Sequence, residues 1–195
     1  MRRATLCSSN AHKARELEAL LLGWTIEPLD VPSGGDDYPP ETGVTYYANA
    51  RLKADFGRAH SAEWVLAEDS GIEVDALGGR PGIHSARYAP EGAPAIAKLL
   101  GELEGVADRA AHYTSELVLL APDGTEYRGT GMLHGRIATE PSGTEGFGYD
   151  PVFVPDAEER TVAELGDAWK ALNSHRARAA QALLRALAGA PATTS

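Results

Sequence analysis

Short apolar runs, some of them alternating with polar residues, mark the β-strands that the sequence predicts. Alternation places every second side chain on one face of a sheet, which is typical of a strand with one buried face. Pro122-Asp123-Gly124 is a turn signal, so the two runs around it predict a long β-hairpin. The predicted strands cover residues 4–8, 24–29, 64–67, 72–77, 111–121 and 125–137, with a further short strand inside 143–155.

Apolar residues that recur every three to four positions predict the helices between these strands. Gly23 is placed to end the first helix, and Ser174 to begin the last one as an N-cap after a break near Asn173. The predicted helices cover residues 11–22, 45–60, 93–103 and 167–187. Because strands and helices are interleaved, the pattern predicts an α/β fold with a mixed sheet, and residues 30–40 form a predicted loop.

The composition favours one globular domain in the cytoplasm. The chain has 195 residues, 43% of them hydrophobic, which is enough for a sizeable core that could form two lobes. No apolar run reaches about 18 residues, so we expect no membrane span, and Met1-Arg2-Arg3 leads into no signal peptide. The one cysteine, Cys7, excludes an internal disulfide and is expected in the core. We expect a single domain over 1–190 and a loose tail over 191–195.

The charge balance argues against a nucleic-acid partner. The formal net charge is -10, whereas affinity for nucleic acid comes largely from basic residues on phosphates. A small anion could still bind in a locally basic pocket. Lysine, a compact point charge suited to phosphate, occurs only at four positions. These positions are Lys13, Lys53, Lys98 and Lys170.

Two segments near the N-terminus could bind an anion. Ser8-Ser9-Asn10 lies between a predicted strand and a helix, where free N–H groups and the helix dipole favour negative charge, and Lys13 follows in the first turn. On this segment alone, the pattern favours the alternative, an ordinary capped helix with a solvated lysine. Asn49 and Lys53 are four residues apart and therefore share one face of the next helix, which is either a binding surface or a solvated face.

The segment Glu68-Asp69-Ser70-Gly71 carries the sharpest chemical signal. Two acids follow an apolar run, and we expect them at the carboxyl end of that strand, where open α/β sheets bind ligands. Adjacent carboxylates suit a hard cation such as Mg²⁺, and one of them could activate water. An acidic surface turn is the alternative. Asp69-Ser70-Gly71 also occurs in aspartic proteases, but the predicted helices argue against their all-β fold.

Two segments in the second half could hold a flat ligand. The loop Gly143–Pro151 places glycines around Phe147 and Tyr149, so backbone can approach a ligand while an aromatic ring stacks on it. His175 and Arg176 lie at a predicted helix start, where positive charge is unfavourable unless an acid or a ligand compensates.

Taken in order, these segments resemble the inosine triphosphate pyrophosphatase family, the non-canonical purine NTP pyrophosphatases. Each motif alone is weak, but the ordered set covers nearly the whole chain and is specific. The resemblance rests on Ser8-Ser9-Asn10 with Lys13 and Glu16, Glu41-Thr42-Gly43 with Asn49 and Lys53, Glu68-Asp69-Ser70-Gly71, Gly78-Gly79-Arg80-Pro81-Gly82, Ser85-Ala86-Arg87-Tyr88, Gly146-Phe147-Gly148-Tyr149-Asp150-Pro151 and Ser174-His175-Arg176.

The resemblance implies an elongated α/β fold with a mixed sheet flanked by helices, two lobes with a central cleft, and a homodimer. It implies cleavage of ITP, dITP or XTP to monophosphate and pyrophosphate with Mg²⁺, Asp69 acting as general base and the metal contacting Glu41, Glu68 and Asp69. The residues implied for the triphosphate are Ser8, Ser9, Asn10, Lys13, Lys53 and Ser70. Those implied for the base are Phe147, Gly148, Tyr149, Asp150, Lys170, His175 and Arg176.

Two positions depart from the family pattern. His84 stands where the family more often has tyrosine, and Glu68 where many bacterial members have aspartate. A nucleotide sensor that binds without turnover is the alternative function. Such a sensor would use the same glycines and cations but has no need of three acids beside a triphosphate.

Overall fold

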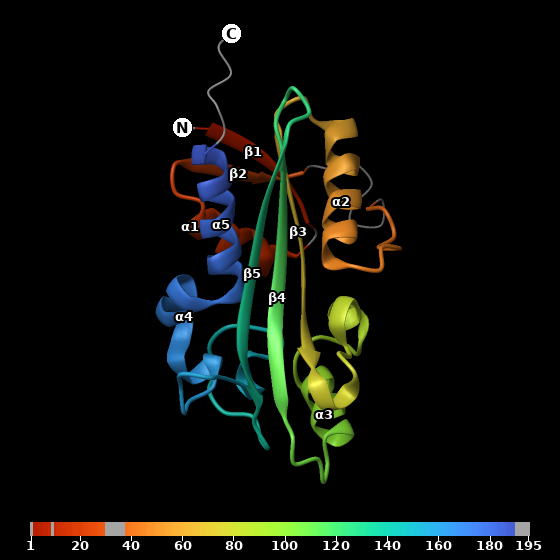
Figure 1. Cartoon of the computed structure of the whole chain (residues 1–195), viewed down its shortest axis with the longest axis vertical. Coiled ribbons are helices and arrows are strands. Elements are labelled where there is room, and N and C mark those ends of the chain that lie inside the picture. The colour runs from red at the N-terminus through yellow and green to blue at the C-terminus, as the bar shows by residue number, and fades with distance from the viewer. Residues whose placement is uncertain (1, 9, 30–37, 190–195) are drawn as a thin grey trace. The chain divides into compact units, whose positions relative to one another are not determined.

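The computed structural model describes residues 2–8, 10–29 and 38–189, and the chain divides into two compact units (Figure 1). Unit 1 comprises residues 1–69, 115–131 and 178–195, and unit 2 comprises residues 70–114 and 132–177. The predicted tail at 191–195 and most of the predicted loop at 30–40 lie outside the described residues. The single domain and the central cleft stay predictions.

Six strands form one open sheet in the order β2-β1-β3-β4-β5-β6. β1 pairs in parallel with β2 and β3, whereas β5 pairs with β6 antiparallel, so the prediction of a mixed sheet is confirmed. The strands are β1 (Arg2–Cys7), β2 (Trp24–Pro28), β3 (Trp64–Val74), β4 (Ala110–Leu120), β5 (Glu126–Ile137) and β6 (Phe153–Pro155).

β3 differs from its prediction in a way that matters for the site. The two strands expected at 64–67 and 72–77 are one strand of 11 residues that ends at Val74. A short 3-10 turn, Asp75–Leu77, follows it and ends at Gly78, which adopts a left-handed conformation. The prediction that Glu68 and Asp69 lie at the carboxyl end of a strand is therefore wrong, because both lie in its middle. Charged residues are tolerated there because partners from other elements pair with them.

In unit 1, both faces of the sheet are covered, and the side chains of β3 and β4 alternate between them. Leu66 and Leu117 pack in the cluster that includes residues of α1 and α5, whereas Val65 and Val118 pack against α2. Figure 1 shows α1 and α5 on one side of these strands and α2 on the other. The helices are α1 (Ala11–Leu20), α2 (Tyr46–His60) and α5 (His175–Gly189).

The close approach of α2 to the sheet depends on a glycine. A Cβ atom at Gly57 would overlap Sγ of Cys7, which is fully buried on β1. Cys7 is therefore a core residue, as expected. Thr45 begins α2 by accepting a hydrogen bond from the backbone N–H of Ala48, so this helix presents Asn49 and Lys53 from a fixed position.

Unit 2 has its own core, to which Leu99, Tyr113 and Phe153 contribute. Its helices are α3 (Ala93–Glu102) and α4 (Val162–Asn173). α4 is interrupted at Gly166, whose φ is 84°, so the predicted start at residue 167 matches the second part of this helix. Ser174 accepts a hydrogen bond from the N–H of Ala177 at 3.1 Å, which confirms it as the N-cap of α5. In the part of the chain with described coordinates, every helix is too short or too polar to cross a bilayer.

Candidate active site

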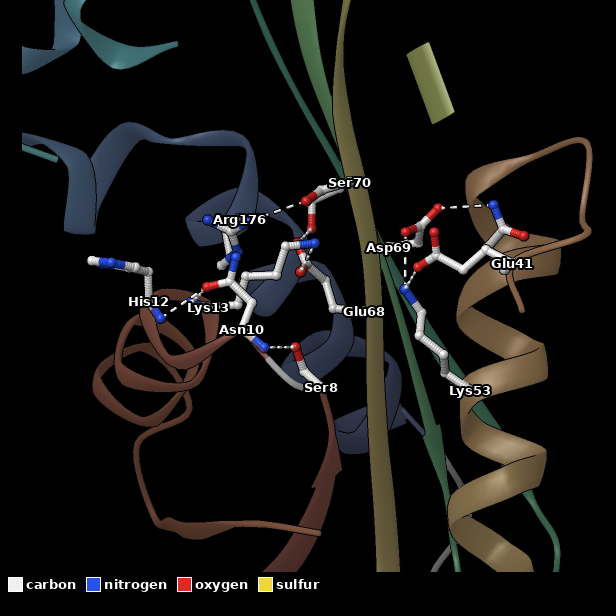
Figure 2. Close-up of polar contacts among 12 residues, drawn as sticks. Ser8, Asn10, His12, Lys13, Glu41, Lys53, Glu68, Asp69, Ser70 and Arg176 are labelled. Carbon is white, nitrogen blue, oxygen red and sulfur yellow. Dashed lines mark hydrogen bonds and ion pairs between the residues drawn. The ribbon is translucent and has the colours of Figure 1, made fainter. Parts of the chain in front are cut away.

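The two acids of β3 point in opposite directions because successive side chains of a strand lie on opposite faces. Glu68 shares the face of Leu66 and meets α1, whereas Asp69 shares the face of Val65 and meets α2. Figure 2 shows Glu68 with Lys13 on one side of β3 and Asp69 with Glu41 and Lys53 on the other. Both carboxylates are buried, with only 1% and 4% of their surface exposed, so each needs a polar partner.

Asp69 is held by two side chains of α2. Lys53 Nζ lies 2.9 Å from Asp69 Oδ1, and Asn49 Nδ2 donates a hydrogen bond to Asp69 Oδ2 at 3.2 Å. The predicted shared face of Asn49 and Lys53 is thus confirmed. Asn49 Oδ1 in turn accepts a hydrogen bond from the backbone N–H of Gly43 at 2.8 Å. This one amide therefore ties Asp69 to the segment that carries Glu41.

Two carboxylates share the ammonium group of Lys53. Its Nζ is 2.7 Å from Glu41 Oε1 as well as 2.9 Å from Asp69 Oδ1. Burial lowers the pKa of Lys53, but Asp69 and Glu41 outweigh that effect and raise it, so the amine stays charged. Burial raises the pKa of Asp69 against the opposing effect of Lys53 and Lys13, and Glu41 adds to the rise. A buried carboxylate with a raised pKa is suited to accept a proton.

Glu68 has a separate set of partners. Ser115 Oγ, on β4, donates a hydrogen bond to Glu68 Oε1 at 2.9 Å, and Lys13 Nζ lies 3.1 Å from Glu68 Oε2. Sequence reasoning missed Ser115, which lies in the middle of β4 between Thr114 and Glu116 and does not stand out from these polar neighbours. Glu68 thus provides the negative charge that Lys13 needs in the first turn of a helix.

The start of α1 is capped by the chain itself. Asn10 Oδ1 accepts hydrogen bonds from the backbone N–H groups of His12 and Lys13, at 2.9 and 3.2 Å. Ser8 Oγ accepts the N–H of Asn10 at 3.2 Å. The structure therefore shows a capped helix whose Lys13 pairs with Glu68 and is not solvated as the alternative expected, and the predicted anion site stays a prediction. Ser9 lies outside the described residues.

The three acids expected to bind Mg²⁺ are not all together. Glu41 and Asp69 converge on one ammonium group, whereas Glu68 lies on the other face of β3. Within the described segments, no group of three or more His, Cys, Asp or Glu side chains is arranged to hold a metal. Two carboxylates still fit Mg²⁺, since this ion usually takes one or two carboxylates and completes its octahedron with phosphate oxygens and water.

Unit 2 brings together the loop with Phe147 and the helix with Lys170. Asp150 Oδ2 accepts a hydrogen bond from the backbone N–H of Phe147 at 2.9 Å and another from Lys170 Nζ at 2.7 Å. Lys170 Nζ lies 4.1 Å from the centroid of the Phe147 ring. The loop needs glycine at position 146, because its φ is 77° and a Cβ there would collide with the Asp150 carboxylate.

The start of α5 adds two buried side chains to unit 2. Arg176, with 1% of its surface exposed, donates a hydrogen bond to Ser70 Oγ at 3.1 Å, and its guanidinium carbon is 5.7 Å from the Phe147 ring centroid. The imidazole of His175 stacks on the ring of Tyr113, with centroids 4.5 Å apart and planes 8° from parallel. Tyr113 is a second residue that the sequence reasoning missed.

Tyr149 and Gly148 have structural tasks in this loop. Tyr149 is buried in the core, and its hydroxyl donates to the backbone carbonyl of Ser85 at 3.3 Å. Burial raises the pKa of Tyr149 to about 12, so the hydroxyl remains a donor at neutral pH. Gly148 has a φ of 62°, a conformation that favours glycine. Predicted base contacts at these two positions stay predictions.

Comparisons with known proteins place the chain in a family. The Ham1 family model matches residues 4–186. The chain belongs to the Ham1 family. A relative from Parasynechococcus marenigrum, named dITP/XTP pyrophosphatase, is 42% identical over 180 residues, which cover 92% of this chain and 91% of that protein. The resemblance found in the sequence is thereby confirmed.

Solved Ham1 family structures share the fold. The Ham1 protein of Staphylococcus aureus superposes with a TM-score of 0.82 at 33% identity, covering 96% of this chain and 99% of that one. A protein from Mycobacterium abscessus, named nucleoside-triphosphatase / dITP/XTP pyrophosphatase, gives a TM-score of 0.74 at 39% identity, covering 95% and 99%. The predicted α/β class with helices flanking a mixed sheet is therefore confirmed.

Proposed function

We propose that this protein hydrolyses non-canonical purine nucleoside triphosphates, namely ITP, dITP and XTP, to the monophosphate and pyrophosphate. The observation that carries the proposal is the buried Asp69, held between Lys53 and Asn49 and beside Glu41. A family whose members are named dITP/XTP pyrophosphatases supplies the reaction and the substrate class.

Asp69 is the proposed general base. Its pKa is raised by burial, and its two oxygens have different partners, Lys53 on one and Asn49 on the other. A carboxylate fixed in this way can orient a water molecule toward the α-phosphorus and accept its proton. General-base catalysis of this kind contributes roughly 10² to 10⁴ in rate.

Mg²⁺ is the proposed cofactor, with Glu41 and Asp69 as its carboxylate ligands and Glu68 as a further candidate on the other face of β3. When bound, Mg²⁺ would neutralise charge on the phosphate oxygens. Glu41 and Asp69 bring two carboxylates to one ammonium group, and carboxylate oxygens are ligands that Mg²⁺ prefers.

The triphosphate carries about four negative charges, and cations must spread the charge that develops during cleavage. Lys13 and Lys53 lie in unit 1 beside the acids and are the proposed phosphate contacts. Further polar groups are proposed for this end of the substrate at Ser8, Ser9, Asn10 and Ser70.

The base is the proposed ligand of the unit 2 group. Phe147 offers a ring for stacking, while Lys170 and Arg176 offer only donors. Inosine and xanthosine present a 6-keto acceptor, whereas adenine presents a 6-amino donor. Donors aimed at that edge favour the keto bases. Phe147, Gly148, Tyr149, Asp150, Lys170, His175 and Arg176 are the residues proposed for the base.

A homodimer and a cytoplasmic location belong to the same proposal. They rest on the resemblance of the whole chain to the family. Light scattering at micromolar concentration is expected to give about twice the 20.6 kDa of one chain. The mass of one chain alone would contradict the dimer.

A substrate panel with a pyrophosphate readout tests the function. We expect ITP, dITP and XTP to release pyrophosphate, with IMP as the other product of ITP, and ATP and GTP to be poor substrates. Excess EDTA is expected to abolish the activity, and added Mg²⁺ to restore it. Tight binding of ITP without any product would instead favour a nucleotide sensor, a function that the acids beside Lys53 disfavour because they would repel a triphosphate.

A further inference from the structure

The interruption of α4 creates a helix start that the helix cannot cap by itself. Gly166 has a φ of 84° and a ψ of 172°, so the helical conformation ends there and begins again at Asp167. The first N–H groups of a helix have no acceptor inside it and are usually capped by a side chain of the residue just before. Gly166 has no side chain to do this.

A carboxylate from the loop of unit 2 takes that place. Glu145 Oε2 accepts a hydrogen bond from the backbone N–H of Asp167 at 2.9 Å. A Cβ atom at Gly166 would lie 2.8 Å from the same oxygen, so Glu145 fills the space that a capping side chain would occupy. The backbone N–H of Glu145 also donates to the carbonyl of Ala163 at 3.3 Å, so Glu145 contacts α4 on both sides of the kink.

The same loop and the same helix meet again at the candidate base site. Phe147 is two residues after Glu145, and Lys170 is three residues after Asp167, in the first turn of the restarted helix. Asp150 joins them by accepting the Phe147 N–H and the Lys170 ammonium on one oxygen. Glu145 and Asp150 therefore fasten the loop to the helix on either side of Phe147.

We propose that Glu145 is a positioning residue that fixes Lys170 relative to the ring of Phe147. A carboxylate at a helix start is also favourable to the helix dipole, which adds to the capping bond. Glu145 needs no contact with the substrate for this role. The proposal rests on the proposed function only for its expected effect on substrates. The contact between Glu145 and the Asp167 N–H lies within unit 2 and does not depend on that function.

The test compares Glu145→Ala with Glu145→Gln. Loss of the cap in Glu145→Ala is expected to raise KM for ITP about fivefold and to reduce the preference for ITP over ATP by a similar factor, with kcat within about twofold. Gln keeps an oxygen that accepts the Asp167 N–H, so Glu145→Gln is expected to stay within about twofold of the wild type in KM. Asp108→Ala is the control, since Asp108 is an exposed carboxylate in the same unit that accepts a hydrogen bond from the N–H of Ala110 at 3.0 Å. This variant is expected to have the KM of the wild type.

Amide hydrogen exchange provides a readout that does not depend on activity. In Glu145→Ala, the amides of 167–170 are expected to exchange faster, while those of the α3 helix stay as in the wild type. Unchanged exchange together with unchanged KM would overturn the proposal. An equal rise of KM in Glu145→Ala and Asp108→Ala would also overturn the proposal, because it would indicate general destabilisation of unit 2. If the wild type hydrolyses none of the triphosphates, the proposed function fails, and the exchange data still decide whether Glu145 holds the helix.

Discussion

The polar residues of the candidate site in unit 1 and those in unit 2 differ in the sign of their net charge. In unit 1, the carboxylates of Glu41, Glu68 and Asp69 meet two lysines, Lys13 and Lys53, which leaves one negative charge in excess. In unit 2, Asp150 is the carboxylate beside Lys170, and Arg176 lies near the same aromatic ring, which leaves one positive charge in excess.

The difference separates the proposed tasks of the two groups. An acidic group would repel a triphosphate unless a further cation is present, so we assign the proposed metal requirement to unit 1. In unit 2, Lys170 and Arg176 place donor groups beside an aromatic ring, which suits a flat base with keto acceptors, and we assign no metal to this group. Metal dependence and base preference should therefore respond to different substitutions.

The largest effect is expected for Asp69→Asn. Asparagine keeps the size of the side chain but loses its negative charge and its basicity, so kcat should fall by roughly 10² to 10⁴ while substrate still binds. Steady-state kinetics with ITP measure this, with the exposed Asp75, which follows β3, changed to Asn as the control. A variant that keeps more than about a third of the wild-type kcat would exclude Asp69 as the base.

The next effect contrasts Arg176→Ala with Lys53→Ala. Removing a buried donor from the base group should lower kcat/KM for ITP much more than for ATP, which reduces their ratio by roughly tenfold to a hundredfold. Lys53→Ala should lower kcat/KM for ITP and for ATP by similar factors, because Lys53 pairs with Asp69 and Glu41 and not with the residues proposed for the base. Measuring kcat/KM for ITP, XTP, GTP and ATP on both variants separates the two tasks.

The opposite pattern would reverse the assignment of the two groups. An unchanged ITP-to-ATP ratio in Arg176→Ala, together with a collapsed ratio in Lys53→Ala, would place the base in unit 1. Because Arg176 is buried, circular dichroism of its variant is the control for folding.

A smaller effect is expected on stability in unit 1, where Gly57 lets α2 approach β1. Gly57→Ala would place a methyl group against Cys7 Sγ, and such overpacking costs about 1 to 3 kcal/mol of the free energy of unfolding. Adding Cys7→Ala should recover part of that loss by making room. Urea denaturation of the two single variants and the double variant measures the coupling. Additive losses would show that the two residues do not compete for space.

The smallest effect concerns the thiol of Cys7. Burial raises the pKa of Cys7 from 9.0 to about 12, against the opposing effect of Lys53. The unfolded thiol loses its proton near pH 9, while the folded thiol keeps it, so this stabilisation is complete below pH 9 and is lost as the pH rises toward 12. Urea denaturation of the wild type and of Cys7→Ala measures this effect. Between pH 8 and pH 10, the free energy of unfolding of the wild type should fall by about 1 kcal/mol more than that of the variant. Equal losses in both proteins would place the thiol in solvent.

The sequence predicted those features that depend on neighbouring residues. The hairpin around Pro122-Asp123-Gly124, the cap at Ser174 and the shared face of Asn49 and Lys53 all follow from spacing along the chain, and the structure has all three.

Features that depend on distant residues were not predicted. Glu68-Asp69-Ser70-Gly71 has the composition of a turn, yet it continues β3 because Lys13, Lys53 and Ser115 pair with its acids. For the same reason, the sequence did not reveal that the side chains of Glu68 and Asp69 lie on opposite faces of the sheet. They do so only because the strand continues unbroken through both residues. Ser115 and Tyr113 were missed because no local pattern distinguishes a supporting side chain from any other core position.

Cleavage in water labelled with heavy oxygen tests the central claim most directly. Attack on the α-phosphorus, assisted by Asp69, places the label in IMP and leaves the released pyrophosphate unlabelled. Mass spectrometry of both products after a single turnover of ITP reports where the oxygen goes. We predict label in IMP alone. Label in the pyrophosphate, or IDP and inorganic phosphate as the first products, would contradict the account.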